Sequence, residues 1–356
     1  VGTGNVGKHA LTQLINDDRF DLTAVWVSSE AKAGKDAAEL AGLPGSTGIL
    51  ATTDLDAVIA TKPACVVYTA LADNRLIEAL EDYRKILAAG INVVGSSAVF
   101  LQYPWQVIPT EMVTPIEDAA QEGSSTIFVN GIDPGFANDL LPLALAGTCQ
   151  SVQQIRCMEI INYDTYDSAP VMFDVMGFGG SLDETPMLLQ PGVLSLAWGS
   201  VVRQLAAGLG IELDEITCVS EYAQTTEDLP MASWTIKAGH VAGVFASWQG
   251  RIDGRTVIDI NVRWKKGQTL EPDWQLDGDG WKITIDGRPT VNMQVGFLPP
   301  PDMIENATTL EDFFVLGHIM TAMPPIHAIP AVVAAAPGIA TYNDLPLPQP
   351  RGVVPR

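Results

Sequence analysis

Six residues at the start of the chain, Gly2 to Gly7, read GTGNVG and complete the pattern G-x-G-x-x-G. In a strand–turn–helix unit, the first glycine permits a tight turn and the second lets the backbone approach a pyrophosphate. The third lets the helix pack closely on the strand, and the helix N-terminus attracts the phosphates. An amphipathic stretch with Ala10, Leu11 and Leu14 on one face follows directly, so we expect a dinucleotide-binding turn rather than a purely structural one. The residues predicted to contact the cofactor here are Gly2, Thr3, Gly4, Asn5, Val6 and Gly7.

The end of the next apolar segment, VWVSSEAKAGK, bears on which nicotinamide cofactor binds. Sites specific for NAD usually carry a carboxylate there for the ribose hydroxyls. Ser28 and Ser29 stand at that place, and Lys32 follows, which suits a 2′-phosphate and favours NADP, with NAD possible. Glu30 could instead turn inward to the ribose. Lys32 and the nearby Lys35 could also simply be solvent-exposed residues at the start of a helix.

Further cofactor and substrate contacts are expected where other strands end, because ligands bind at the carboxyl ends of parallel strands. The segment YTALADNR places Thr69 and Ala70 there, and GSSAVFLQYPW places Ser96. Thr69 and Ala70 are predicted to run beside the nicotinamide half of the cofactor.

The segment INYDTYDS offers groups for proton transfer. If residues 161–168 form a strand, Tyr163 lies on one face, and Asp164 and Tyr166 lie on the other. Tyrosine can orient or protonate a carbonyl oxygen, and a carboxylate can take a proton. His327 in PPIHAIP is a further candidate proton donor. The alternatives are ordinary cross-strand pairs and a structural histidine.

An apolar substrate pocket would need large side chains from both halves of the chain. These side chains could equally belong to a hydrophobic core. The predicted pocket residues are Phe100, Phe173, Met176, Phe178 and Trp198.

These residues must be positioned by two kinds of sheet. Short apolar segments alternate with helical ones over residues 1–135, which predicts an α/β fold with a doubly wound parallel sheet of the Rossmann type. Residues 136–306 alternate apolar and polar positions between turns, which predicts a second α+β domain with a mixed, largely antiparallel sheet for substrate binding and dimerisation. Residues 307–356 are expected to form helices and a tail that return to the Rossmann domain.

Composition limits the partners. The chain has 42 acidic against 20 basic residues and a net charge of −22, which disfavours nucleic acid and anionic membranes. No apolar run of membrane-spanning length and no signal sequence are evident, and the four cysteines are far apart. We therefore expect a cytoplasmic protein without bound metal. We also expect a few residues to precede Val1, because a strand should lead into the glycine turn.

Several segments, in their order along the chain, resemble the native amine dehydrogenases. They are GTGNVG, VWVSS, YTALADNR, GINVVGSS, NGIDPGF and HAIPAVVAAAPGI followed by DLP. This family is related to 2,4-diaminopentanoate dehydrogenase and carries a dihydrodipicolinate-reductase-like N-terminal domain. The resemblance implies a homodimer that uses NAD(P)H to convert a small ketone and ammonia, through an imine, into an amine.

One departure from the resemblance concerns SSAVFLQYP. The resemblance leads us to expect a glutamate close to the Tyr-Pro pair, and this stretch has no carboxylate. The sequence therefore predicts an NAD(P)H-dependent oxidoreductase acting on C=O or C=N bonds of a small apolar ketone or imine. An imine or ketone reductase and a non-catalytic NAD(P)-binding sensor stand as alternatives.

Overall fold

The computed structural model describes residues 1–72, 75–164, 170–185, 190–231, 234–274, 276, 278–308, 310–351 and 353–354. The chain forms two compact units, which are described separately. Unit 1 comprises Val1–Phe136 and Val315–Arg356, and unit 2 comprises Ala137–Phe314. Tyr166, one of the predicted proton donors, lies outside the described residues.

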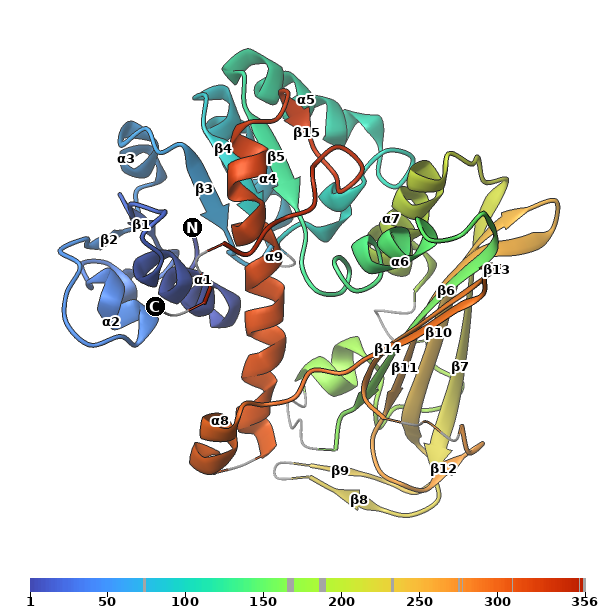
Figure 1. Ribbon diagram of the computed structural model, residues 1–356. Helices are drawn as coiled ribbons and strands as arrows, with labels where there is room; N and C mark the ends of the chain where they lie inside the picture. Colours follow the sequence, from blue (N-terminus) through green and yellow to red (C-terminus); the bar gives the residue numbers. More distant parts are fainter. Residues whose placement is uncertain are drawn as a thin grey trace. The chain divides into compact units, whose positions relative to one another are not determined.

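Unit 1 is built on parallel strands (Figure 1). One sheet has the order β15-β5-β4-β3, and β1 pairs in parallel with β2. Val1 and Gly2 connect the two sheets, because the Val1 amino group donates to Val67 O at 2.6 Å and Gly2 N donates to Trp26 O at 3.0 Å. The strands are β1 (Val25–Trp26), β2 (Ala51–Thr52), β3 (Cys65–Tyr68), β4 (Asn92–Gly95), β5 (Thr126–Val129) and β15 (Gly338–Ile339).

Helices cover both faces of this sheet. Val93 and Val94 of β4 point to opposite faces, and both are fully buried. Both α4 and α9 contact β4, α5 packs on α4, and α1 packs on α9. The predicted doubly wound Rossmann sheet is therefore confirmed. The helical segments are α1 (Asn5–Asn16), η1 (Glu30–Lys32), α2 (Ala37–Ala41), α3 (Leu55–Ala60), α4 (Leu76–Ala88), η2 (Val99–Gln102), α5 (Thr110–Gly123) and α9 (Val315–Val333).

Helix α9 differs from what the sequence suggested. It continues through Pro324, Pro325 and Pro330. By length and apolar composition alone, Asp312–Val333 would suffice to cross a membrane, so the expectation that no such stretch exists is wrong. Prolines and histidines interrupt the apolar residues of Asp312–Val333, but the mean hydropathy of this segment stays as high as that of a membrane-spanning helix. In this structure α9 contacts α1, β3, β4 and β5.

Unit 2 contains a seven-stranded sheet of order β12-β7-β10-β11-β6-β13-β14. Only the β11–β6 pairing is parallel among the described pairings, so the predicted mixed, largely antiparallel sheet is confirmed. The sheet strands are β6 (Ser151–Asn162), β7 (Glu215–Thr225), β10 (Val241–Ile252), β11 (Arg255–Lys265), β12 (Leu270–Glu271), β13 (Gly280–Arg288) and β14 (Val291–Val295). The other segments are α6 (Leu140–Ala146), η3 (Pro170–Val175), α7 (Pro191–Leu209), β8 (Leu229–Pro230), β9 (Thr235–Ile236), α8 (Pro301–Asn306) and η5 (Leu310–Phe314).

The two faces of this sheet differ. Helix α7 packs on β7, β10 and β11, and α6 packs on β6 and β13. Trp248 and Gly250 of β10 point toward α7, where Trp248 stacks on Trp198 and a side chain at Gly250 would collide with Val202. Ser247, which directly precedes Trp248, therefore points to the opposite face.

Candidate functional site

The three glycines of GTGNVG have different surroundings. Gly2 has φ +87°, and a Cβ atom there would lie 2.5 Å from Ala70 N. A Cβ atom on Gly7 would lie 2.2 Å from Gly2 O and 2.7 Å from Thr69 Oγ1. A Cβ atom on Gly4 would meet no described atom within 4 Å. Gly2 and Gly7 are therefore required by the turn itself, whereas Gly4 leaves an open approach to the backbone.

Gly4 is also the N-cap residue of α1, and no side chain caps this helix. The N–H groups of the first turn have no partners within the helix, and together with the helix dipole they attract a phosphate. Asn5 is exposed, and Thr3 and Val6 are partly exposed. This arrangement fits the pyrophosphate of a dinucleotide.

The ends of β3 and β4 are joined to the glycine turn by hydrogen bonds. Thr69 N donates to Val1 O at 2.8 Å, and Thr69 Oγ1 donates to Gly2 O at 3.1 Å. Ser97 Oγ donates to Ala70 O in a short hydrogen bond, and Ser96 N donates to the last residue of β3 at 3.2 Å. Thr69, Ala70 and Ser96 thus lie along the same edge of the sheet as the glycine turn.

Lys32 reaches the glycine turn from the end of β1. Its Nζ donates to Thr3 O at 2.7 Å and lies 3.3 Å from Thr3 Oγ1. Ser28, Ser29 and Glu30 precede it and are exposed. Lys32 thus lies beside the glycine turn, and Ser28, Ser29 and Glu30 follow β1, where the adenosine ribose is expected.

His327 does not lie near this turn. It is close enough to Asp17 and Arg19 for both charges to act on it, and these residues follow the C-terminal end of α1. Burial, and then the positive charge of Arg19, lower the pKa of His327. Because α1 is about 18 Å long, at about 1.5 Å per residue, His327 sits near the end of α1 that is opposite the cofactor turn. Its role as a proton donor stays a prediction.

Two other histidines lie closer to the turn. His9 is in the second turn of α1, and its ring stacks on that of His318 of α9, with ring centroids 6.4 Å apart. Burial lowers the pKa of both rings, and the charges of His318 and Lys8 lower that of His9 further. Sequence analysis assigned neither residue a role.

We expect this histidine pair to make unit 1 less stable in acid. Folding lowers the pKa of each ring from the unfolded value of 6.5, so in acid the unfolded state binds more protons than the folded state. The free energy of unfolding therefore decreases as the pH falls below 6.5. We expect the melting temperature to decrease between pH 7 and pH 5, and to decrease less in His9→Gln and His318→Gln variants. Differential scanning fluorimetry across this range measures the effect. Exposed His240 provides the control His240→Gln, and a slope equal to the control's in all variants would exclude the pair as the cause.

Unit 2 contains an aromatic cluster that we define as Tyr163, Phe178, Trp198, Trp248 and Trp264. Trp198 stacks on Trp248 with ring centroids 4.7 Å apart and meets Trp264 at 6.2 Å. Tyr163 lies 6.1 Å from Trp264 and 5.9 Å from Phe178. Three residues predicted from the sequence, Tyr163, Phe178 and Trp198, are therefore brought together.

A carboxylate that sequence analysis missed adjoins this cluster. Glu159 of β6 is 7% exposed, and its Oε2 accepts a hydrogen bond from Trp264 Nε1 at 2.8 Å. The pattern of β6 carried the signal, because Ile155, Cys157 and Glu159 share one buried face. A buried carboxylate beside aromatic rings is suited to a cation such as an iminium or ammonium group.

Three of the predicted pocket residues do not join the aromatic cluster in the described contacts. Phe173 is 47% exposed and meets Trp234 edge-on at 6.4 Å. Met176 is buried within unit 2. Phe100 belongs to unit 1, where it is 5% exposed.

The predicted strand over residues 161–168 is confirmed at 161–162, where β6 ends, and is wrong at Tyr163 and Asp164. Residues 165–168 lie outside the described part of the chain. Asp164 instead holds a turn: its carboxylate accepts hydrogen bonds from Gly267 N and from Gln268 Nε2, the latter at 2.7 Å. Buried Lys266 donates to Tyr163 O at 2.5 Å and to Asp164 O at 3.1 Å. These long-range contacts end the strand early and engage the Asp164 carboxylate.

A cavity of about 400 Å³ in unit 1 adjoins the glycine turn. Gly2, Thr3, Gly7 and Thr69 line it, and it extends to the residues that precede β1 and β3, namely Thr23, Ala24, Pro63 and Ala64. In the described part of the chain, no group of three or more histidine, cysteine or acidic side chains is placed to hold a metal ion.

The chain resembles proteins of known activity over most of its length. Residues 136–352 match the family model of the 2,4-diaminopentanoate dehydrogenase C-terminal domain. An amine dehydrogenase of Streptomyces virginiae is 34% identical over 351 residues, which cover 97% of this chain and 95% of that protein. The 2,4-diaminopentanoate dehydrogenase of Acetoanaerobium sticklandii is 27% identical over 294 residues, or 82% and 76% of the two chains.

A solved structure shares the fold. The amine dehydrogenase from Mycobacterium smegmatis superposes with a TM-score of 0.74 at 20% identity, covering 98% of this chain and 96% of that one. Together with the Rossmann sheet and the glycine turn, these similarities define an NAD(P)-dependent oxidoreductase. Because the family model covers most of the chain, the protein belongs to the 2,4-diaminopentanoate dehydrogenase family, and the predicted resemblance is confirmed.

Proposed function

We propose that this protein is an amine dehydrogenase that converts a small, largely apolar ketone and ammonia into an amine at the expense of NADPH. The observation that carries the proposal is the match to the Streptomyces virginiae amine dehydrogenase along nearly the full length of both chains. The aromatic cluster and Glu159 support it, because they offer apolar surface and a negative charge within unit 2.

The residues of unit 1 suit the binding of the cofactor. The bound dinucleotide supplies the hydride for reduction of the C=N bond. The first turn of α1 would hold its pyrophosphate, and Gly4 would let that group approach the backbone. Lys32, Ser28 and Ser29 favour the 2′-phosphate of NADP over the unmodified ribose of NAD. Glu159 is suited to stabilise positive charge on a nitrogen-containing intermediate.

A second candidate function is the reduction of preformed imines or of ketones without ammonia. The loop after β4 favours it, because Val99, Phe100 and Gln102 place no carboxylate beside the Tyr103-Pro104 pair. Ammonia addition and water loss require proton transfers that a carboxylate there would assist.

A substrate panel separates these functions. Oxidation of NADPH is followed with cyclic ketones and cyclic imines, with and without ammonia. The proposal expects turnover of ketones that depends on ammonia. Ketone turnover without ammonia, or turnover of imines alone, would support the second candidate, and no turnover with any compound would exclude both.

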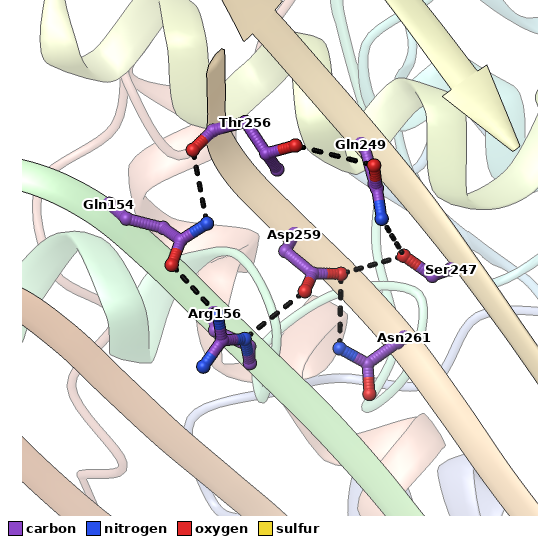
Figure 2. A network of polar contacts seen from close by, with 7 residues as sticks. All are labelled: Gln154, Arg156, Ser247, Gln249, Thr256, Asp259 and Asn261. Atoms are coloured by element: carbon purple, nitrogen blue, oxygen red, sulfur yellow. Dashed lines mark hydrogen bonds and ion pairs between the residues drawn. The ribbon is translucent and has the colours of Figure 1, made fainter. Parts of the chain in front are cut away.

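We further propose that two copies associate through the face of the unit 2 sheet that points away from α7. A polar network covers part of this face (Figure 2). Asp259 bonds Arg156 at 3.1 Å and Ser247 at 2.8 Å. Val219 of β7 pairs with Ser247 and is 42% exposed on the same face. The face thus carries a positive charge, a negative charge and apolar surface. In a twofold dimer the same face of each copy meets the other, so opposite charges and apolar groups can pair across the interface.

The dimer prediction is tested with a charge on this face. We expect the wild type to sediment as a dimer and Val219→Arg to sediment as a monomer with an unchanged circular dichroism spectrum, because a buried unpaired charge opposes association. Ile77→Arg is the matched control, since Ile77 is 72% exposed on α4 of unit 1. A dimeric Val219→Arg variant would place the interface elsewhere.

A further inference from the structure

Gln102 is a buried amide whose polar atoms have no partner. Its side chain is 1% exposed, and neither Oε1 nor Nε2 has a hydrogen-bond partner among the described residues. Buried amide groups in proteins are nearly always hydrogen-bonded, because an unpaired buried donor or acceptor is unfavourable. Here both the donor and the acceptor of the amide lack a partner among the described residues, and one explanation is a ligand that completes these hydrogen bonds.

The position of Gln102 favours that explanation. It ends η2, which follows β4 on the sheet edge that carries the glycine turn and packs against β5. Ala98, at the start of η2, has φ +55°, a left-handed conformation that is uncommon for alanine and is concentrated at functional sites.

The loop that carries Gln102 is anchored to the cofactor turn. Ser97 Oγ donates to Ala70 O, and Tyr83 OH donates to Ser97 O at 3.0 Å. Ala70 in turn packs against Gly2, where a side chain would collide with its backbone. The sheet edge that binds the dinucleotide therefore also fixes the start of η2.

We propose that Gln102 binds the carbonyl or imine group that receives the hydride. Its Nε2–H is suited to donate to a carbonyl oxygen, and its Oε1 is suited to accept from the N–H of an imine or iminium group. The amide is neutral and does not titrate, so Gln102 orients this group and transfers no proton. The inference rests on the proposed reduction of C=O or C=N bonds and names the residue that contacts the reacting atoms.

The first experiment replaces Gln102 with methionine, which has similar size and no hydrogen-bonding amide. We expect the melting temperature to stay the same or to rise, because an unpaired buried amide is removed. Binding of NADP⁺ should be unchanged. Binding of cyclohexanone to the NADP⁺-loaded protein, measured by calorimetry, and kcat/KM for ketones should each fall about tenfold or more. Gln121→Met is the matched control, because the Gln121 amide is exposed and bonds Pro337 O.

A second variant covers the case in which Gln102→Met does not fold. Gln102→Glu keeps the shape and adds an ionisable group. We expect kcat/KM to acquire a new pH dependence, since burial opposes ionisation of this carboxyl. A pH profile identical to that of the wild type, with unchanged ketone binding, would overturn the inference.

The outcomes separate this inference from the proposed function. Wild-type turnover of ketones with ammonia and full activity of Gln102→Met would overturn the role of Gln102 and leave the function standing. No wild-type turnover, together with ketone binding that Gln102→Met weakens, would exclude the function and support the binding role. A wild type that neither binds nor reduces any ketone or imine would overturn both.

Discussion

Replacing Gly4 with valine is expected to weaken dinucleotide binding by roughly 100-fold or more while leaving the melting temperature almost unchanged. A Cβ atom at Gly4 meets no described protein atom within 4 Å, and φ −76° is accessible to any residue. The protein itself therefore tolerates the side chain. The added methyl groups occupy the space through which the pyrophosphate must approach the first turn of α1. Fluorescence titration with NADPH measures the loss.

Gly7→Ala provides the contrast in the same turn. Its Cβ atom would lie 2.2 Å from Gly2 O, so the turn must shift, and both the melting temperature and NADPH binding should decrease. Gly317→Ala in α9 is the control, because its Cβ atom also meets no described atom within 4 Å, and alanine is favoured in a helix. A Gly4→Val variant that binds NADPH as the wild type does would show that the phosphates lie elsewhere.

The second large effect is expected at Lys32. Lys32→Ala should weaken NADPH binding about tenfold or more and weaken NADH binding much less, because only NADPH carries a 2′-phosphate for the ammonium group to pair with. The loss for NADPH should shrink as salt is raised, since exposed charges are screened. Dissociation constants for both cofactors at two salt concentrations test this.

Lys35→Ala is the matched control for Lys32. Lys35 lies near the same end of β1, but its Nζ pairs with Glu39 at 2.7 Å on the surface of α2. We expect its loss to affect neither cofactor. Equal losses for NADPH and NADH in Lys32→Ala would mean that Lys32 only supports Thr3, to which it donates in this structure.

The parts of the protein that local patterns specify were predictable. GTGNVG could be recognised from the spacing of its glycines, and the structure places Gly2 and Gly7 against backbone atoms and leaves Gly4 open. The two sheet types followed from the spacing of apolar residues, since alternation with helices requires parallel strands. The family resemblance likewise rested on short segments in a fixed order.

The candidate groups for proton transfer were not predictable in the same way. INYDTYDS has a strand-like pattern, yet Asp164 is held by Gly267 and Gln268, which lie far along the chain and end the strand at Asn162. Sequence analysis proposed His327 as a proton donor and assigned His318 no role. The packing of α1 on α9 brings His318 to His9 and leaves His327 by Asp17, and no local pattern shows either neighbour.

A Rossmann unit with a dinucleotide turn, a second unit with a mixed sheet and membership of a dehydrogenase family could thus be predicted from the amino-acid sequence. Which polar groups are buried and which have partners became visible only in the folded chain: Glu159 against Trp264, and the Gln102 amide without a partner among the described residues. Helix and strand patterns depend on neighbours a few residues away. The burial and pairing of a carboxylate or an amide depend on segments that only folding brings together.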